Sequence, residues 1–204
     1  AAAMGYSMGI KLDAIRQGLR TFDTTFFQAP GRMNVYGEHP FKVIMDYAHN
    51  AHAVGMMADL AQRLDAQRRI VVMAGPGDRR DQDLIEIAGA VAGKFDHYIC
   101  RRDDSLRGRD GDEVPRILAQ ALQAAGVTKE AITIIPDEQE AIDAGLRMGK
   151  PGDLLTIRNQ GNGSGQIGVV GNAVFYEGTQ IGAFTGGAGS TGARRQFWPV
   201  YTTV

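Results

Sequence analysis

Phe41-Lys42-Val43-Ile44-Met45 is an apolar run that leads directly into Asp46-Tyr47-Ala48-His49-Asn50. The run predicts a buried strand, and Asn50 is of a residue type that begins helices as an N-cap. This stretch therefore predicts a strand whose carboxyl end opens into a helix. In an open α/β sheet, ligands bind at the carboxyl ends of the strands, and a helix N-terminus at that edge favours anions. A ligand-binding site is therefore expected at the end of this strand.

The alternation of strand and helix continues from this stretch towards the C-terminus. Helices are expected at about 51–65, 82–92, 112–125 and 137–147, and strands at about 70–74, 95–100, 132–135 and 154–157. A hairpin of 33–36 with 41–46 would begin the series. Apolar strands that alternate with amphipathic helices need right-handed crossovers and give a parallel sheet covered on both faces. The expected fold class is α/β, with a Rossmann-like, mostly parallel sheet.

The chain is expected to divide into three parts. Residues 1–30, with a short amphipathic helix and a linker, would end a preceding domain. Residues 31–158 would form the Rossmann-like domain. Residues 159–204 hold 11 of the 27 glycines and only three acidic or basic residues. This glycine-rich extension either pairs as a β-hairpin or meander on the domain, or is a flexible or oligomer-forming arm.

Composition excludes several classes of protein. A net charge of -1 gives no reason to expect nucleic acid or an anionic membrane as a partner. No apolar run approaches the roughly 20 residues that span a bilayer, and the N-terminus lacks the features of a signal peptide. Cys100 is the only cysteine, so neither an internal disulfide nor a multi-thiolate metal site can form. These features are typical of a cytoplasmic protein.

Two motifs in order carry a resemblance to a known family. Pro30-Gly31-Arg32 lies in the linker, and Asp46-Tyr47-Ala48-His49 follows one strand later. The pair resembles the C-terminal domain of the Mur ligase superfamily, which contains ATP-dependent amide-forming ligases. Gly75-Pro76-Gly77-Asp78-Arg79-Arg80-Asp81 and the segment from Arg102 to Arg109 are most similar to the cyanophycin synthetases of that superfamily. The resemblance covers roughly residues 1–158.

The resemblance implies a binding edge for ATP with Mg²⁺ around the first two motifs. Arg32 would hold a phosphate, for which a guanidinium is well shaped, and Asp46 would lie near the ribose or phosphates. His49 would donate to the γ-phosphate or the acyl phosphate, with Tyr47 and Asn50 beside the nucleotide. Arg32 and His49 are thus the candidate catalytic residues. Each of the five residues has a structural alternative: a surface ion pair for Arg32, a strand-end cap or turn for Asp46, the core for Tyr47, a structural role beside the strand for His49 and an N-cap for Asn50.

Two further loops follow strands and are expected to bind the substrate. Asp78, Arg79 and Arg80 lie in the first, and Asp103, Asp104 and Arg107 lie in the second. The first loop superficially resembles a dinucleotide fingerprint, but Arg80 stands where the third glycine is required, so NAD is not expected. By resemblance, Arg107 would hold an α-carboxylate, and one of the two aspartates of its loop would hold a cationic side chain. Salt bridging within solvated loops is the alternative reading of both.

The function implied is amide formation through an acyl phosphate, with arginine joined to an aspartate side chain as in cyanophycin synthesis. The partners would be a small-molecule amino acid and an acidic peptide or polymer, in a homo-oligomeric parent enzyme. The sequence contains no G-x-x-x-x-G-K-[ST] phosphate loop, so these residues would form half an active site and be inactive alone. The alternatives are another Mur-type peptide or folylpolyglutamate ligase, or a non-catalytic binding or assembly module.

Overall fold

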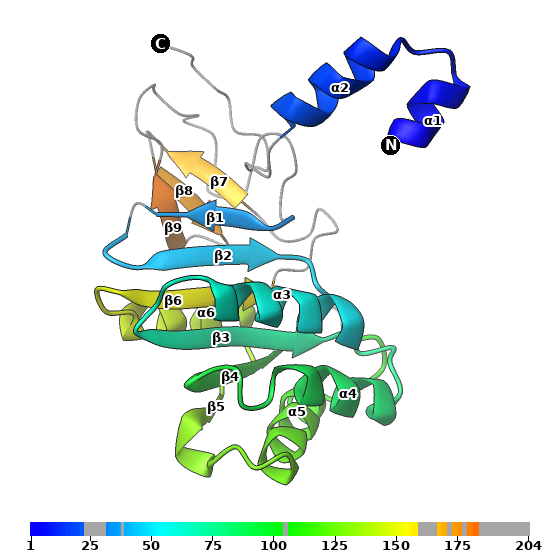
Figure 1. The fold of residues 1–204 in the computed structure, drawn as a ribbon. Coiled ribbons are helices and arrows are strands. Elements are labelled where there is room, and N and C mark those ends of the chain that lie inside the picture. Colours follow the sequence, from blue (N-terminus) through cyan, green and yellow to red (C-terminus); the bar gives the residue numbers. More distant parts are fainter. Residues whose placement is uncertain are drawn as a thin grey trace.

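A six-stranded sheet is the centre of the computed structural model (Figure 1). The structure describes residues 1–22, 32–37, 39–103 and 106–158, and the backbone of 167–170, 173–176 and 179–183. The strands of the sheet are β1 (Asn34–Tyr36), β2 (Lys42–Asp46), β3 (Arg68–Gly75), β4 (His97–Arg102), β5 (Ile132–Ile134) and β6 (Asp153–Arg158). Their order is β1-β2-β6-β3-β4-β5, with β1 antiparallel to β2 and every other neighbouring pair parallel. The predicted α/β fold with a mostly parallel sheet is confirmed.

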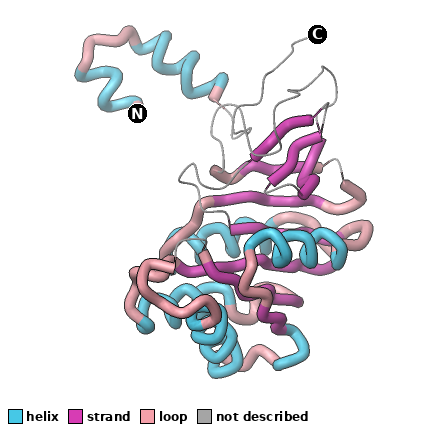
Figure 2. The backbone as a smooth tube through the Cα atoms, turned by 180° about the vertical axis from the view of Figure 1, so that it is seen from behind, coloured by secondary structure: helices cyan, strands magenta, loops and turns pink. Residues whose placement is uncertain are grey.

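Helices cover both faces of the sheet, as Figures 1 and 2 show from opposite sides. They are α3 (Ala51–Arg63), α4 (Asp81–Val91), α5 (Glu113–Ala124) and α6 (Glu138–Met148), with the short 3-10 helix η1 (Lys129–Ala131) before β5. Consecutive strand residues enter opposite cores, because side chains alternate along a strand. In β3, Val71 packs in the core under α3, α4 and α5, whereas Val72 packs in the core under α6. This two-sided burial explains the continuous apolar runs that predicted the strands.

The position of β6 brings distant parts of the chain together. This last strand of the sheet enters between β2 and β3, after α6 has returned along the opposite face from α3, α4 and α5. Asp46 at the end of β2 is consequently the register partner of Arg158 at the end of β6. Such a reversal of strand order is where α/β sheets open a ligand crevice at the carboxyl edge.

One expected strand is displaced along the sequence. The strand expected at 95–100 runs instead from His97 to Arg102. The Tyr98 hydroxyl accepts the N–H of Phe95, and the Asp96 carboxylate accepts the N–H of Arg69, so both of these residues belong to the connection before the strand. The shift places Arg101, a charged residue, inside the sheet.

The remaining elements lie outside the six-stranded sheet. They are α1 (Ala2–Ser7), α2 (Leu12–Thr21), β7 (Ile167–Val170), β8 (Ala173–Tyr176) and β9 (Thr179–Ala183). The amphipathic helix expected near the N-terminus is α2, and the backbones of β7, β8 and β9 form an antiparallel three-stranded sheet. Among the residues that the structure describes, no helix combines the length and the apolarity that crossing a membrane requires.

Candidate functional site

The turn after β2 is built on the Asp46 carboxylate. Its Oδ2 accepts the backbone N–H of Met33 at 2.8 Å, and its Oδ1 accepts the N–H of Ala48 at 2.7 Å. Met33 has a φ of 52°, a left-handed conformation that few residues other than glycine adopt. Asp46 thus ties the segment before β1 to the end of β2. Asp46 thus has the turn-forming role that the sequence analysis gave as its structural alternative. Because Arg32 directly precedes Met33, the same contact also positions Arg32.

Three side chains stand in a row beside this turn. The guanidinium carbon of Arg32 lies 4.4 Å from the centroid of the Tyr47 ring, and the ring centroids of Tyr47 and His49 are 4.6 Å apart. A guanidinium over the face of an aromatic ring is held by a cation–π interaction and keeps its N–H groups free to donate. The structure therefore brings together three of the residues predicted for the nucleotide edge.

Asn50 begins helix α3. Its side-chain Oδ1 accepts the N–H of Ala53 at 2.9 Å, so the predicted N-cap is confirmed. The cap fixes the first turn of α3 immediately after His49. Positive partial charge from the helix N-terminus therefore lies at the same edge as the row of Arg32, Tyr47 and His49.

The surroundings of His49 are strongly cationic. Partial burial lowers the pKa of His49, and the charges of Arg158, Arg79 and Arg32 lower it further, in that order. His49 is thus neutral at neutral pH, with an N–H to donate. Two of the three guanidinium groups near it, those of Arg32 and Arg79, form no ion pair with a carboxylate among the described residues, whereas Arg158 does. Such an arrangement attracts an anion.

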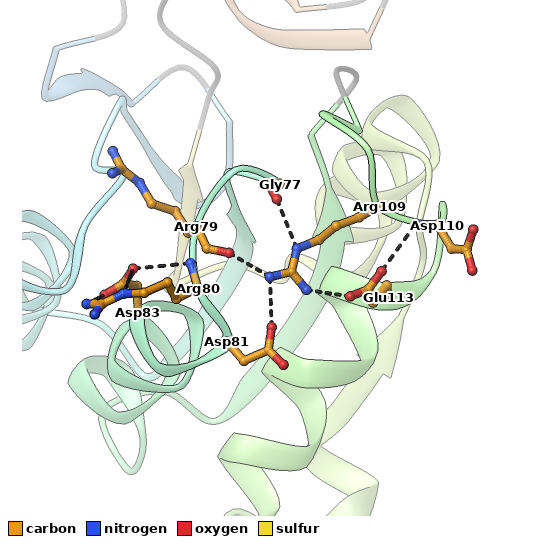
Figure 3. A network of polar contacts seen from close by, with 8 residues as sticks. All are labelled: Gly77, Arg79, Arg80, Asp81, Asp83, Arg109, Asp110 and Glu113. Carbon is orange, nitrogen blue, oxygen red and sulfur yellow. Dashed lines mark hydrogen bonds and ion pairs between the residues drawn. The ribbon is translucent and has the colours of Figure 1, made fainter.

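The loop between β3 and α4 is held by Arg109, a residue to which the sequence analysis gave no role (Figure 3). Its Nε donates to the Gly77 carbonyl at 2.9 Å, and its Nη2 donates to the Arg79 carbonyl at 2.6 Å and to Asp81 at 2.7 Å. The Arg79 side chain extends in the opposite direction, away from Arg109 (Figure 3). Arg109 therefore fixes the backbone from which Arg79 reaches towards the His49 side of the edge.

The other charged residues of these loops pair with one another. Arg80 caps α4 and binds Asp83 at 2.7 Å with an 81% exposed side chain, as the salt-bridging alternative predicted. Arg107 binds Asp78 at 2.6 Å, and the hydrogen bond from Arg107 lowers the pKa of Asp78. The Arg107 backbone has a φ of 49°, and its side chain remains partly exposed, so further N–H groups are available to a ligand.

Asp103 has a different environment from the one expected. It is 7% exposed and pairs with the buried Arg158, while Arg101 lies 3.8 Å away. A carboxylate with two buried guanidinium partners is not placed to hold an incoming cationic side chain. Asp104, the other aspartate predicted for that task, lies outside the residues that the structure describes.

A buried ionic network behind the edge was missed by the sequence analysis. Arg101 and Arg158 are its cations, and Asp103 and Glu138 are its anions. The available signal was a charged residue inside or at the end of an apolar strand, as in Ile99-Cys100-Arg101 and Thr156-Ile157-Arg158. Such residues are rarely buried unless they are paired.

The side chains at this edge fit phosphate better than they fit a metal ion. Arg32, Arg79 and His49 offer N–H donors and positive charge, which phosphate oxygens require. Across the described ranges, no group of three or more His, Cys, Asp or Glu side chains is placed to hold a metal ion. The side chains that this chain supplies at the edge are therefore suited to bind phosphate oxygens.

Comparison with known proteins gives relatives in sequence and in fold. Residues 31–158 match the family model "Mur ligase, glutamate ligase domain". The chain is 36% identical over 157 residues to cyanophycin synthetase of Geminocystis herdmanii, covering 77% of this chain and 18% of that protein. It is 29% identical over 164 residues to UDP-N-acetylmuramoyl-L-alanyl-D-glutamate--2,6-diaminopimelate ligase of Aquifex aeolicus, covering 79% of this chain and 32% of that protein.

A solved structure with the same fold is folylpolyglutamate synthase of Mycobacterium tuberculosis, determined with ADP and AMPPCP. Its TM-score is 0.56 at 22% identity, and the match covers 74% of this chain and 33% of that one. The chain thus spans between about a fifth and a third of the length of these three relatives.

Proposed function

The chain belongs to the Mur ligase family, and from this premise we propose that it forms one side of the active site of an ATP-dependent amide-forming ligase. The observation that carries the proposal is the gathering of Arg32, Arg79 and His49 at the carboxyl edge of the sheet. Arg32 and Arg79 form no ion pair with a carboxylate within the ranges that the structure describes, and cationic side chains of this kind next to a helix N-terminus are suited to the phosphates of a nucleotide.

The chemistry proposed is activation of a carboxylate by phosphorylation. ATP converts the carboxylate to an acyl phosphate, and an amine then displaces phosphate to form the amide. Arg32 and Arg79 would balance the charge on the phosphate oxygens, and the neutral His49 would donate its N–H to one of them. These residues would act by positioning and by electrostatic stabilisation, which dominate phosphoryl transfer. Mg²⁺ would accompany the nucleotide.

The substrates proposed are those of a cyanophycin synthetase, with arginine joined to the side-chain carboxylate of an aspartate in an acidic polymer. The identity to cyanophycin synthetase supports this choice over a peptidoglycan or folate substrate. Arg107 would receive the α-carboxylate of the amino acid, because Asp78 fixes one of its nitrogens and leaves the other donors free. Asp103 has no place in this proposal, because buried arginines already hold it.

We call Arg32, Arg79 and His49, at the carboxyl edge of the sheet, the phosphate edge. Binding of ADP by this chain tests it. We expect ADP to perturb the NMR signals of Tyr47, His49 and Asn50, and we expect Arg79→Ala to weaken binding about tenfold. A charge-assisted contact of about 1.5–3 kcal/mol corresponds to a change of that size or more. Arg116→Ala is the matched control, because Arg116 lies on α5 in an exposed pair with Asp112. Equal ADP affinity in the two variants would remove Arg79 from the site.

A further inference from the structure

The buried side chain of Arg158 contacts two loops. They follow β2 and β4, which are not neighbours in the sheet. Arg158 ends β6 and is 2% exposed. Its Nε donates to the Ala48 carbonyl at 3.3 Å, and its Nη1 pairs with Asp103. Ala48 precedes His49 in the turn after β2, and Asp103 follows β4. The guanidinium thus joins the proposed phosphate edge to the beginning of the loop that leads to Arg107.

The rest of the buried network fixes this guanidinium from behind. Arg101 donates from Nη2 to the Arg158 carbonyl at 2.7 Å, and it pairs with Glu138 at the beginning of α6. Among the described residues the ion pairs join two cations and two anions, so the formal charges of these four side chains balance. Buried ion pairs with several hydrogen bonds hold a fixed geometry, whereas exposed pairs exchange freely with water. Arg158 is therefore a rigid reference point rather than a mobile surface cation.

We infer that Arg158 is a positioning residue that sets the Ala48–His49 turn against the loop after β4, and so sets the spacing between the phosphate edge and Arg107. The inference rests on the proposed function for the roles of His49 and Arg107. Because Arg158 is buried, it acts through the Ala48 carbonyl and Asp103 rather than by touching the nucleotide. The charge of Arg158 also lowers the pKa of His49. Only burial lowers this pKa more, and Arg79 and Arg32 are the other charged groups that lower it.

The test replaces both members of the ion pair. Arg158→Met together with Asp103→Asn removes the bridge and leaves no buried carboxylate without its main partner, which is the usual cause of failure in such variants. The matched control is Arg68→Met together with Asp153→Asn. That pair joins β3 to β6 at the opposite edge of the sheet at 2.6 Å, and Arg68 lowers the pKa of His97 as Arg158 lowers that of His49.

The readouts are the NMR titrations of the four histidines and the affinity for ADP. In the Arg158 double variant we expect the pKa of His49 to rise, that of His97 to stay, and ADP affinity to fall severalfold. In the control, the pKa of His97 should rise while His49 and ADP affinity keep their wild-type values. A folded Arg158 double variant with wild-type His49 titration and wild-type ADP affinity would overturn the inference.

Arg158→Lys keeps the buried charge and serves as a second variant should the double variant fail to fold. A lysine has one nitrogen and cannot reach Ala48 and Asp103 with the fixed geometry of a guanidinium. We expect weaker ADP binding with a still-lowered His49 pKa, and unchanged binding would contradict positioning.

If the wild-type chain binds no ADP, the proposed function fails. The His49 titration and the amide signals of residues 47–49 and 106–109 then still decide whether Arg158 joins the two loops.

Discussion

At the scale of single residues, the structure distinguishes charged groups that stabilise the fold from charged groups that are open to a ligand. Asp46 and Asp103 were both predicted to face a ligand, yet the first accepts two backbone N–H groups and the second pairs with a buried arginine. Arg32 and Arg79, by contrast, pair with no carboxylate in the part of the chain that the structure describes, and the Arg32 guanidinium lies over the ring of Tyr47. The edge is therefore cationic because the carboxylates of Asp46 and Asp103 are already bound within the protein.

His49 gives a prediction about pH. In the free protein its pKa is lowered by burial and by the guanidinium groups around it, so the imidazole is neutral at neutral pH. A bound phosphate favours the charged imidazole and raises this pKa, so proton uptake accompanies binding. We expect ADP affinity, measured by calorimetry between about pH 8 and pH 5, to rise as the pH falls through the titration of His49.

The control for this prediction is His49→Gln, which retains a hydrogen-bond donor but cannot titrate. The pH dependence that remains in this variant belongs to ADP itself and to other groups. The same slope in both proteins would show that His49 does not sense the bound phosphate.

At the scale of elements, the loop after β3 is set by a close backbone approach as well as by Arg109. A Cβ placed on Gly77 would lie 2.2 Å from the carbonyl oxygen of Leu106, which is backbone and cannot simply rotate away. The loops after β3 and β4 therefore touch at a glycine, and this contact brings Asp78 within reach of Arg107. The two predicted substrate loops form one surface for this steric reason.

Gly77→Ala should consequently separate these two loops. We expect a loss of about 1–3 kcal/mol in the free energy of unfolding, measured with urea, because the added methyl group has no space. Gly89→Ala is the matched control: Gly89 is exposed on α4 and a Cβ there meets nothing within 4 Å. That control should gain roughly 0.5–1 kcal/mol from helix propensity. A neutral Gly77→Ala would mean that the loops are not held in contact.

At the scale of the whole molecule, the sheet collects the candidate site from segments that are far apart in the sequence. Entry of β6 between β2 and β3 places Arg158 beside Asp46, and parallel pairing places the ends of β2, β3, β4 and β6 along one edge. The surface made in this way is one-sided. It offers N–H donors that would suit phosphate, and the sequence has no glycine-rich phosphate loop that would complete such a site.

The 204 residues alone should therefore bind ADP weakly and form no amide. We expect no ATP-dependent product from arginine and an aspartate-rich peptide, measured by release of inorganic phosphate and by mass spectrometry of the peptide. Addition of a relative's phosphate-loop domain as a separate protein is the informative control, since it could supply the missing half of the site. Amide synthesis by this chain without such an addition would contradict the half-site proposal.

The sequence by itself determined the fold class, the alternation of strands and helices, and the turn that follows β2. These features depend on local patterns: apolar runs for strands buried on both faces, helical periodicity, and an N-cap at Asn50. Only the tertiary structure decided which charges are presented at the edge. Whether Asp103 meets a ligand or Arg158 depends on the insertion of β6 between two earlier strands. Strand order follows from packing of the whole chain, and no local stretch of sequence encodes it.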